Sequence, residues 1–471
     1  MLMTLIQKEM MHHILSVRFI VLLLMCLLLI PLTLTINYRS YRQNLIDYQE
    51  TVKLDNSEEI TVNTNMELKP ELEFSKLYLK PTPLGVFANG LGDALPSYLG
   101  MTRNGITQGP PALVSTSLFY LLGHLDFLFL VGTVFSLLAL LFTFDAVAGE
   151  REAGTLRITL ANALPRDLFL WSKLIGGYIV FIIPFLVSFL FGLLLLVSQG
   201  FPLGESDIFP RVLSLTLVSM IYIAVFFLIG TVISTYLDNS KTALIIAFTV
   251  WVFAVLIIPR VGFITAKFIA PTQTSQSIYL EKTAIRENFN DEVREKRGEI
   301  QTEYWKDRPS PSIQEQVNAS SEIDKQLAPV EAEYRQKYND SANEIDRRYN
   351  REQARQESVA ETLSRISPTS SLIYLTTNLT RTGKAKRTNY FEAGERYFNS
   401  LHAELFSKIR DYIPVRIMNP KDNIQLTPPP LVETPTLGET FRQSLVDVLL
   451  LCFFAVVLTT VAFLKFFRSD I

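Results

Sequence analysis

Cysteine and histidine are scarce in this chain. Its 471 residues include two cysteines and four histidines. Cys26 and Cys452 both fall inside hydrophobic runs, so we expect no disulfide in the hydrophilic segments. His12 and His13 are neighbours, and adjacent side chains on a helix point roughly 100° apart, so this pair does not predict a metal site. The sequence therefore predicts no metal centre and no bound cofactor, and it leaves little room for a histidine-based active site.

Several motifs of enzyme chemistry are missing as well. The sequence contains no G-x-x-x-x-G-K-[ST], H-E-x-x-H, G-x-S-x-G or C-x-x-C pattern. Without the first pattern the chain lacks the usual phosphate-binding loop, so we do not expect it to be an enzyme by itself. If the protein works with ATP, a separate subunit must bind the nucleotide.

Charge is almost absent from the long apolar runs, apart from Asp126 and Asp447 at their margins. Ion-coupled carriers place Asp, Glu or His within the membrane, so this pattern argues against such a carrier. It also argues against an intramembrane enzyme, because no nucleophile and base lie at membrane depth. A net charge of -2 and 48% hydrophobic residues do not fit a nucleic-acid-binding protein.

Apolar residues are abundant, and they gather in six runs of the length that a spanning helix needs, about 17 to 25 residues. We expect spans at 19–36, 118–144, 174–197, 212–237, 242–259 and 445–464. An even number places both termini on one side. Basic residues next to the spans concentrate on that side, which predicts that both termini are cytoplasmic. The predicted fold class is a mainly α, polytopic membrane protein.

The segment between the second and third spans is short and charged. Its thirty residues, 144–173, read FDAVAGEREAGTLRITLANALPRDLFLWSK and carry eight charges. Glu150 and Glu152 suit the positive end of a helix, Gly154 permits a break in the backbone, and Pro165 limits the second helix. These charges would be costly in hydrocarbon, so the connector must lie outside the membrane.

This connector resembles the first cytoplasmic loop of the permease subunits of type-2 ABC (ABC-2) exporters, which carries an E-x-E-x-G-T-L pattern. The resemblance rests on FDAVAGEREAGTLR, NALPR and WSKLIGG, and it extends to ISPTSSL at 366–372. It implies a coupling helix within 145–173 that contacts a cytoplasmic ABC ATPase subunit, and an N-terminal elbow helix at 1–18, where apolar residues recur at helical spacing. The coupling residues so implied are Glu150, Arg151, Glu152, Gly154, Thr155 and Leu156. The alternative is an ordinary charged loop without that role.

The two remaining hydrophilic segments, 37–117 and 265–442, are predicted to be extracytoplasmic. In the first, the stretches 58–65 and 77–79 predict short strands, and the glycines from 90 to 109 predict irregular loops. In the second, charged stretches with sparse apolar residues at helical spacing predict a helical hairpin over 275–306 and 320–364, with a solvated single helix as the alternative.

The resemblance, together with the lack of a recognisable targeting signal, implies a permease subunit of an ATP-driven exporter in the plasma (inner) membrane. Its partners would be cytoplasmic ABC ATPase subunits, which would hold ATP and Mg, a second permease that is identical or a paralogue, and the lipid bilayer. An extracytoplasmic partner is a further possibility that the large outer segments leave open. The alternative function is a non-transporting scaffold or receptor whose outer hairpin binds a partner protein.

Overall fold

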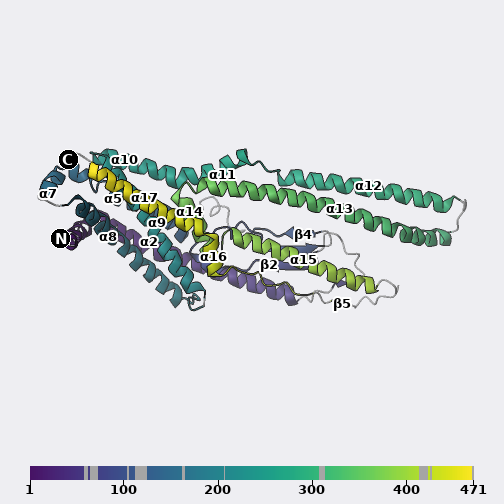
Figure 1. Cartoon of the computed structure of the whole chain (residues 1–471). Coiled ribbons are helices and arrows are strands. Elements are labelled where there is room, and N and C mark those ends of the chain that lie inside the picture. Colours follow the sequence, from purple (N-terminus) through teal and green to yellow (C-terminus); the bar gives the residue numbers. More distant parts are fainter. Residues whose placement is uncertain are drawn as a thin grey trace. The chain divides into compact units, whose positions relative to one another are not determined.

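The computed structural model of the chain is mainly helical (Figure 1). It describes residues 1–57, 62–63, 73–102, 105–111, 125–161, 165–205, 207–306, 313–412, 423–424 and 427–468. Within these described residues, six helices are long and apolar enough to cross a membrane, which confirms the predicted mainly α, polytopic fold class. The chain divides into two compact units, Met1–Ile257 with Ser367–Ile471, and Ile258–Ile366.

Apart from the second, the spans are longer than their predicted apolar runs. They are α2 (Val17–Ser57); α4 (Phe127–Phe129), π-helical η2 (Leu130–Phe135) and α5 (Ser136–Thr143) together; α8 (Arg166–Ser198); α9 (Ile208–Tyr236); α10 (Ser240–Trp251) with π-helical η3 (Val252–Ile257) and α11 (Ile258–Ile269); and α17 (Leu445–Arg468). Residues 118–124 of the predicted second span lie outside the described residues.

Aromatic side chains hold the spans of the first unit together. The rings of Phe135 and Phe185 lie 5.3 Å apart edge to face, and those of Phe127 and Phe189 lie 5.1 Å apart. All four are buried. Because lipid is as apolar as these side chains, close packing of this kind, rather than exclusion of water, stabilises contacts between spans.

A short polar helix is buried among the spans. α14 (Pro368–Leu379) contacts α9 and α17, and its Ser367 cap and Thr369 are buried. The Tyr222 hydroxyl of α9 donates to the Gly132 carbonyl of η2 over 2.8 Å and lies 3.0 Å from the Thr369 hydroxyl. The first bond gives a partner to a carbonyl in the π-helical segment. Together the two contacts of Tyr222 join the second span, the fourth span and α14.

A small sheet packs against a helix from the other hydrophilic segment. β2 (Ser75–Tyr78), β3 (Tyr98–Thr102) and β4 (Gly105–Gln108) are antiparallel, with Leu77 opposite Leu99 and Met101 opposite Ile106. Tyr390 and Tyr397 of α15 (Lys384–Tyr412) cover the sheet. β1 (Val62–Asn63) pairs with β5 (Asn423–Ile424), and η1 (Pro83–Val86) precedes β3.

The loops predicted from the glycines are wrong at two positions. Gly100 lies within β3 and Gly105 begins β4. An ideal Cβ at Gly100 would lie 2.5 Å from Oε1 of Glu73 and 2.6 Å from Oγ1 of Thr107. Gly100 therefore permits two side chains to cross the strand closely, and its presence does not mark a loop.

A buried arginine joins three segments at the end of the bundle where α9 begins. Arg211 is 1% exposed, and its Nε donates to Asp207 over 2.9 Å. Its amino groups donate to the carbonyls of Leu379 and Pro435 over 3.0 and 2.7 Å. Arg381 also donates to Asp207. The start of α9 is thereby tied to the end of α14 and to the segment that leads through α16 (Leu437–Gln443) into the last span.

The second unit contains the predicted helical hairpin, so the hairpin is confirmed. α12 (Ser275–Trp305) and α13 (Ile313–Ser364) are antiparallel, with Lys282 paired to Asp346 over 2.6 Å and the ring of Phe289 lying 6.3 Å from that of Tyr334. α11 packs closely on the end of α13, because an ideal Cβ at Gly262 would lie 2.8 Å from the Ser364 nitrogen.

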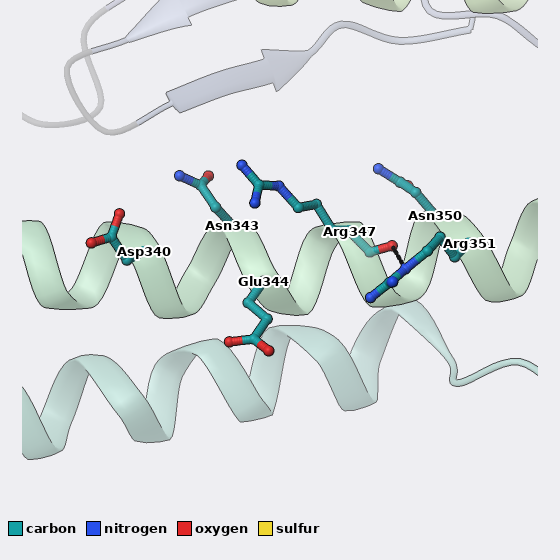
Figure 2. A pocket seen from close by; sticks show the side chains of 6 residues that line it. All are labelled: Asp340, Asn343, Glu344, Arg347, Asn350 and Arg351. Carbon is teal, nitrogen blue, oxygen red and sulfur yellow. Dashed lines mark hydrogen bonds between the residues drawn. The ribbon is translucent and has the colours of Figure 1, made fainter.

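A shallow pocket lies along α13. Figure 2 shows Asn343 and Arg347 directed to one side of the helix and Glu344 directed toward α12. Every lining residue is polar or charged, and ligand pockets are usually mostly apolar. The pocket is therefore a hollow in a solvated helix surface; it is lined by Asp340, Asn343, Glu344, Arg347, Asn350 and Arg351.

Candidate functional site

The connector between the second and third spans consists of two short helices, α6 (Ala148–Glu152) and α7 (Thr155–Ala161). Gly154 separates them with a φ of +72°, a conformation that favours glycine. The Ala153 and Gly154 N–H groups donate to the carbonyls of Gly149 and Arg151, which ends α6. α7 lies at the same end of the first unit as the N-terminus (Figure 1). Residues 162–164 are not among the described residues.

The start of the connector is anchored to the first and fourth spans. Arg18 of α2 forms two hydrogen bonds of 2.7 Å with Asp145. The buried Ser234 hydroxyl of α9 accepts from the Val147 and Ala148 N–H groups over 2.9 and 3.0 Å. Because these N–H groups begin α6 and have no partner within it, the serine satisfies donors that would otherwise be buried and unpaired.

Glu150 ties the connector to the third span and to the N-terminal helix. Its Oε1 lies 2.6 Å from Nζ of Lys173 on α8. The same Nζ lies 3.3 Å from Oε1 of Glu9 on α1 (Leu2–Ile14) and 5.1 Å from the centre of the Phe169 ring. The Lys173 side chain is only 8% exposed, so one buried cation compensates two carboxylates.

Arg151 and Glu152 tie the connector to the turn between the fourth and fifth spans. Arg151 donates to Asp238 over 2.7 Å and to the Leu237 carbonyl over 3.3 Å. The Glu152 carboxylate accepts from the Ser240 N–H over 3.0 Å. Ser240 is the first residue of α10, so this carboxylate lies at the positive end of the fifth span. The connector therefore contacts the first, third, fourth and fifth spans.

The six predicted coupling residues divide into an exposed and an inward group. Glu152, Gly154 and Thr155 are exposed, whereas Leu156 is 1% exposed and packs in the core. Glu150 and Arg151 face inward through their ion pairs, although neither is fully buried. The apolar side chain most exposed on α7 is that of Ile158, at 68% among the described residues. The coupling role of all six residues stays a prediction.

The N-terminal helix packs against α8 at two adjacent glycines of the WSKLIGG stretch. An ideal Cβ at Gly176 would lie 3.1 Å from Cβ of Glu9 and 3.2 Å from the Ile6 carbonyl oxygen. One at Gly177 would lie 3.4 Å from Nε2 of His13. Small residues of this kind allow helix backbones to approach closely. α1 is thus docked on the third span beside Lys173.

His13 is directed inward from α1. Its ring stacks on that of Phe142 with centroids 4.7 Å apart, and its Nε2 lies 4.0 Å from Oε2 of Glu9. Burial is the main reason that the pKa of His13 falls to about 4, because it disfavours the charged imidazolium. His13 is therefore neutral at physiological pH. No group of three potential ligands among His, Cys, Asp and Glu comes together in the described part of the chain.

Sequence reasoning missed Glu9 as a partner of Lys173, and it treated Lys173 only as a basic residue beside a span. A lysine at the start of a long apolar helix was the available signal, since a buried ammonium requires a carboxylate. Glu9 is the only acidic residue of α1. Its pairing could not be assigned because 164 residues separate it from Lys173.

Comparison with known proteins identifies the family of this chain. The family model described as "ABC-2 family transporter protein" matches residues 3–471, which is nearly the whole chain. No curated protein matches the sequence. The matched range includes the six spans, the connector, the buried helix α14 and the hairpin. The chain therefore belongs to the ABC-2 family of transporter proteins.

Proposed function

We propose that this chain is the permease subunit of an ATP-driven exporter and that α6 and α7 dock on a separate cytoplasmic ABC ATPase subunit. The observation that carries the proposal is the two-sided connector. Glu152, Gly154 and Thr155 are exposed, while Asp145, Glu150 and Arg151 hold ion pairs to the first span, the third span and the turn before the fifth. A surface exposed on one side and tied to several spans on the other is suited to passing movement into the membrane.

The contacts suggest how movement of an ATPase would reach the spans. A displacement of α6 acts on α8 through Glu150 and on the start of α10 through Glu152. In the proposed assembly two permeases and two ATPase subunits work together, ATP and Mg are bound by the ATPases, and both termini are cytoplasmic. The spans would then open a path for substrate between the two permeases.

The first test is co-purification from detergent-solubilised native cells. We expect an ABC ATPase to co-purify with the wild-type chain and to be lost or uncoupled with Glu152→Arg, because the reversed charge lies on the exposed side of α6. Glu395→Arg, an exposed change on α15, should retain the partner. Glu152→Gln should separate the role of the negative charge from that of the hydrogen bond to α10, since its amide oxygen can still accept from the Ser240 N–H. Failure of any nucleotide-binding protein to co-purify with the wild type would refute the proposal.

The scaffold or receptor alternative draws on a different part of the chain. α12 and α13 belong to a unit that is separate from the one holding the connector, and their outward surface is polar. If the hairpin alone carried the function, Glu152→Arg would have no effect and removal of the hairpin would abolish partner binding. The connector contacts favour the exporter, because a scaffold has no need of a loop tied to four spans.

A further inference from the structure

Lys173 holds two carboxylates from different elements, and the two are not equivalent. Nζ lies 2.6 Å from Oε1 of Glu150 on the connector and 3.3 Å from Oε1 of Glu9 on α1. A static tether between the connector and the third span needs only Glu150. The second carboxylate increases the negative charge of a poorly solvated site, which is unfavourable unless it has a separate role.

We infer that Lys173 is a pivot: it holds the connector through Glu150 at rest, and it keeps Glu9 as its partner when movement of the connector withdraws Glu150. This inference rests on the proposed function, which supplies the movement. Glu9 is accordingly a positioning residue for coupling, although it lies far from the connector in the sequence.

The surroundings of the two carboxylates fit these different roles. Glu9 is held in place, because its Cβ lies against Gly176 and its second oxygen faces His13 at 4.0 Å. Its side chain is 10% exposed, whereas that of Glu150 is 28% exposed. Glu150 can therefore leave Lys173 and be hydrated by water, while Glu9 cannot leave without displacing α1.

Glu9, which stays with Lys173, lowers the free energy needed to move the connector. A buried ammonium without a carboxylate is strongly unfavourable, because little water reaches it. With Glu9 present, Lys173 stays compensated after Glu150 has left. Without Glu9, the same movement would leave a side chain that is 8% exposed carrying an unpaired charge, so the connector would be held in its resting position.

The first experiment removes the carboxylate of Glu9 in the permease that is co-purified with its ATPase. We expect Glu9→Gln to leave the ATPase bound and the Glu150–Lys173 pair intact. ATP hydrolysis by the complex should slow severalfold, because release of Glu150 would then leave Lys173 without a carboxylate. Glu395→Gln, which removes an exposed carboxylate on α15, should hydrolyse ATP as the wild type does. Hydrolysis by Glu9→Gln at the wild-type rate would show a static tether and overturn the pivot.

The second experiment needs no ATPase and tests the resting pair in the full chain purified in detergent. In a double-mutant cycle of Glu150→Gln and Lys173→Met, we expect the combined effect on the thermal unfolding rate to differ from the product of the single effects by about tenfold. Lys8→Met, on the exposed side of α1, is the control for loss of a lysine charge.

The outcomes separate the two levels of inference. Independent effects of Glu150→Gln and Lys173→Met would overturn the pivot alone. A wild-type chain that shows the coupling but never retains an ATPase would contradict the proposed function, and the moving pivot with it.

Discussion

Two basic side chains are buried at opposite ends of the bundle, and they are compensated in different ways. Lys173 relies on carboxylates, whereas Arg211 distributes its donors over one carboxylate, two backbone carbonyls and the Thr440 hydroxyl. The guanidinium presents several N–H groups in a fixed plane, and that geometry serves three chain segments at once. At this scale, the identity of the cation matters as much as its charge.

Replacement of Arg211 by lysine should therefore be damaging although the charge is kept. An ammonium cannot reach Asp207 and the carbonyls of Leu379 and Pro435 together, so buried acceptors lose their donors. We expect Arg211→Lys to reduce the free energy of unfolding by about 3 kcal/mol. Thermal unfolding in detergent measures this loss, with the exposed Arg442→Lys as the matched control. Equal stability of the two variants would contradict the role given to the planar side chain.

His13 makes stability depend on pH. Its pKa in the folded chain is lowered to about 4, chiefly by burial, although the facing carboxylates of Glu9 and Asp145 act to raise it and Lys173 and His12 act to lower it. The unfolded chain takes up the proton first as the pH falls, so stability is lost from about pH 6.5 down to about pH 4, by up to about 3 kcal/mol.

The test is thermal unfolding measured across this pH range. His13→Gln should show a shallower loss of stability between pH 6.5 and pH 4 than the wild type. His12→Gln, at the exposed neighbouring position, should keep the wild-type slope. Parallel slopes for all three chains would show that His13 is accessible to protons in the folded state.

At the scale of elements, the apolar runs predict the spans because hydrocarbon length and helix rise fix their number of residues. The contacts of the connector could not be predicted from the sequence. Helical spacing cannot show that Leu156 is buried while Thr155 is exposed, since that depends on how the connector packs in the folded chain. β3 and β4 were missed because strand glycines that permit close contacts look like loop glycines.

The docking of α1 on α8 should depend on Gly176. A leucine there would push into Ile6 and Glu9, so we expect Gly176→Leu to displace α1 and to increase amide hydrogen exchange across Leu2–Ile14. Gly298→Leu is the matched change, because an ideal Cβ at Gly298 meets nothing within 4 Å. Unchanged exchange in α1 of Gly176→Leu would show that the close contact does not hold the helix.

At the scale of the whole molecule, each of the two units is stabilised internally by different interactions. The first unit packs aromatic side chains and buries polar bonds, whereas the hairpin has a narrow aromatic seam and ion pairs on a solvated surface. Exposed ion pairs contribute little to stability, about 0 to 1 kcal/mol each. The hairpin is therefore expected to contribute little to the folding of the first unit.

Excision of the hairpin tests this separation. Lys282 and Asp346 face each other across the two helices, so a short glycine and serine linker can replace residues 283–345. We expect the shortened chain to remain monodisperse in detergent by gel filtration and, on the proposed function, to retain the ATPase. The control is insertion of the same linker at Gly204, where a Cβ would meet nothing within 4 Å. Aggregation of the shortened chain alone would mean that the hairpin is needed for folding.

The π-helical segments in the second and fifth spans change how surfaces on these helices must be assigned. Each wide turn holds more residues than an α-helical turn, so the faces before and after it are out of phase by roughly one residue, or about 100°. A helical wheel drawn through 127–143 or 240–269 as one regular helix would place lipid-facing and protein-facing positions on the wrong sides of one half. Labelling or scanning mutagenesis of either span needs a separate wheel on each side of its wide turn.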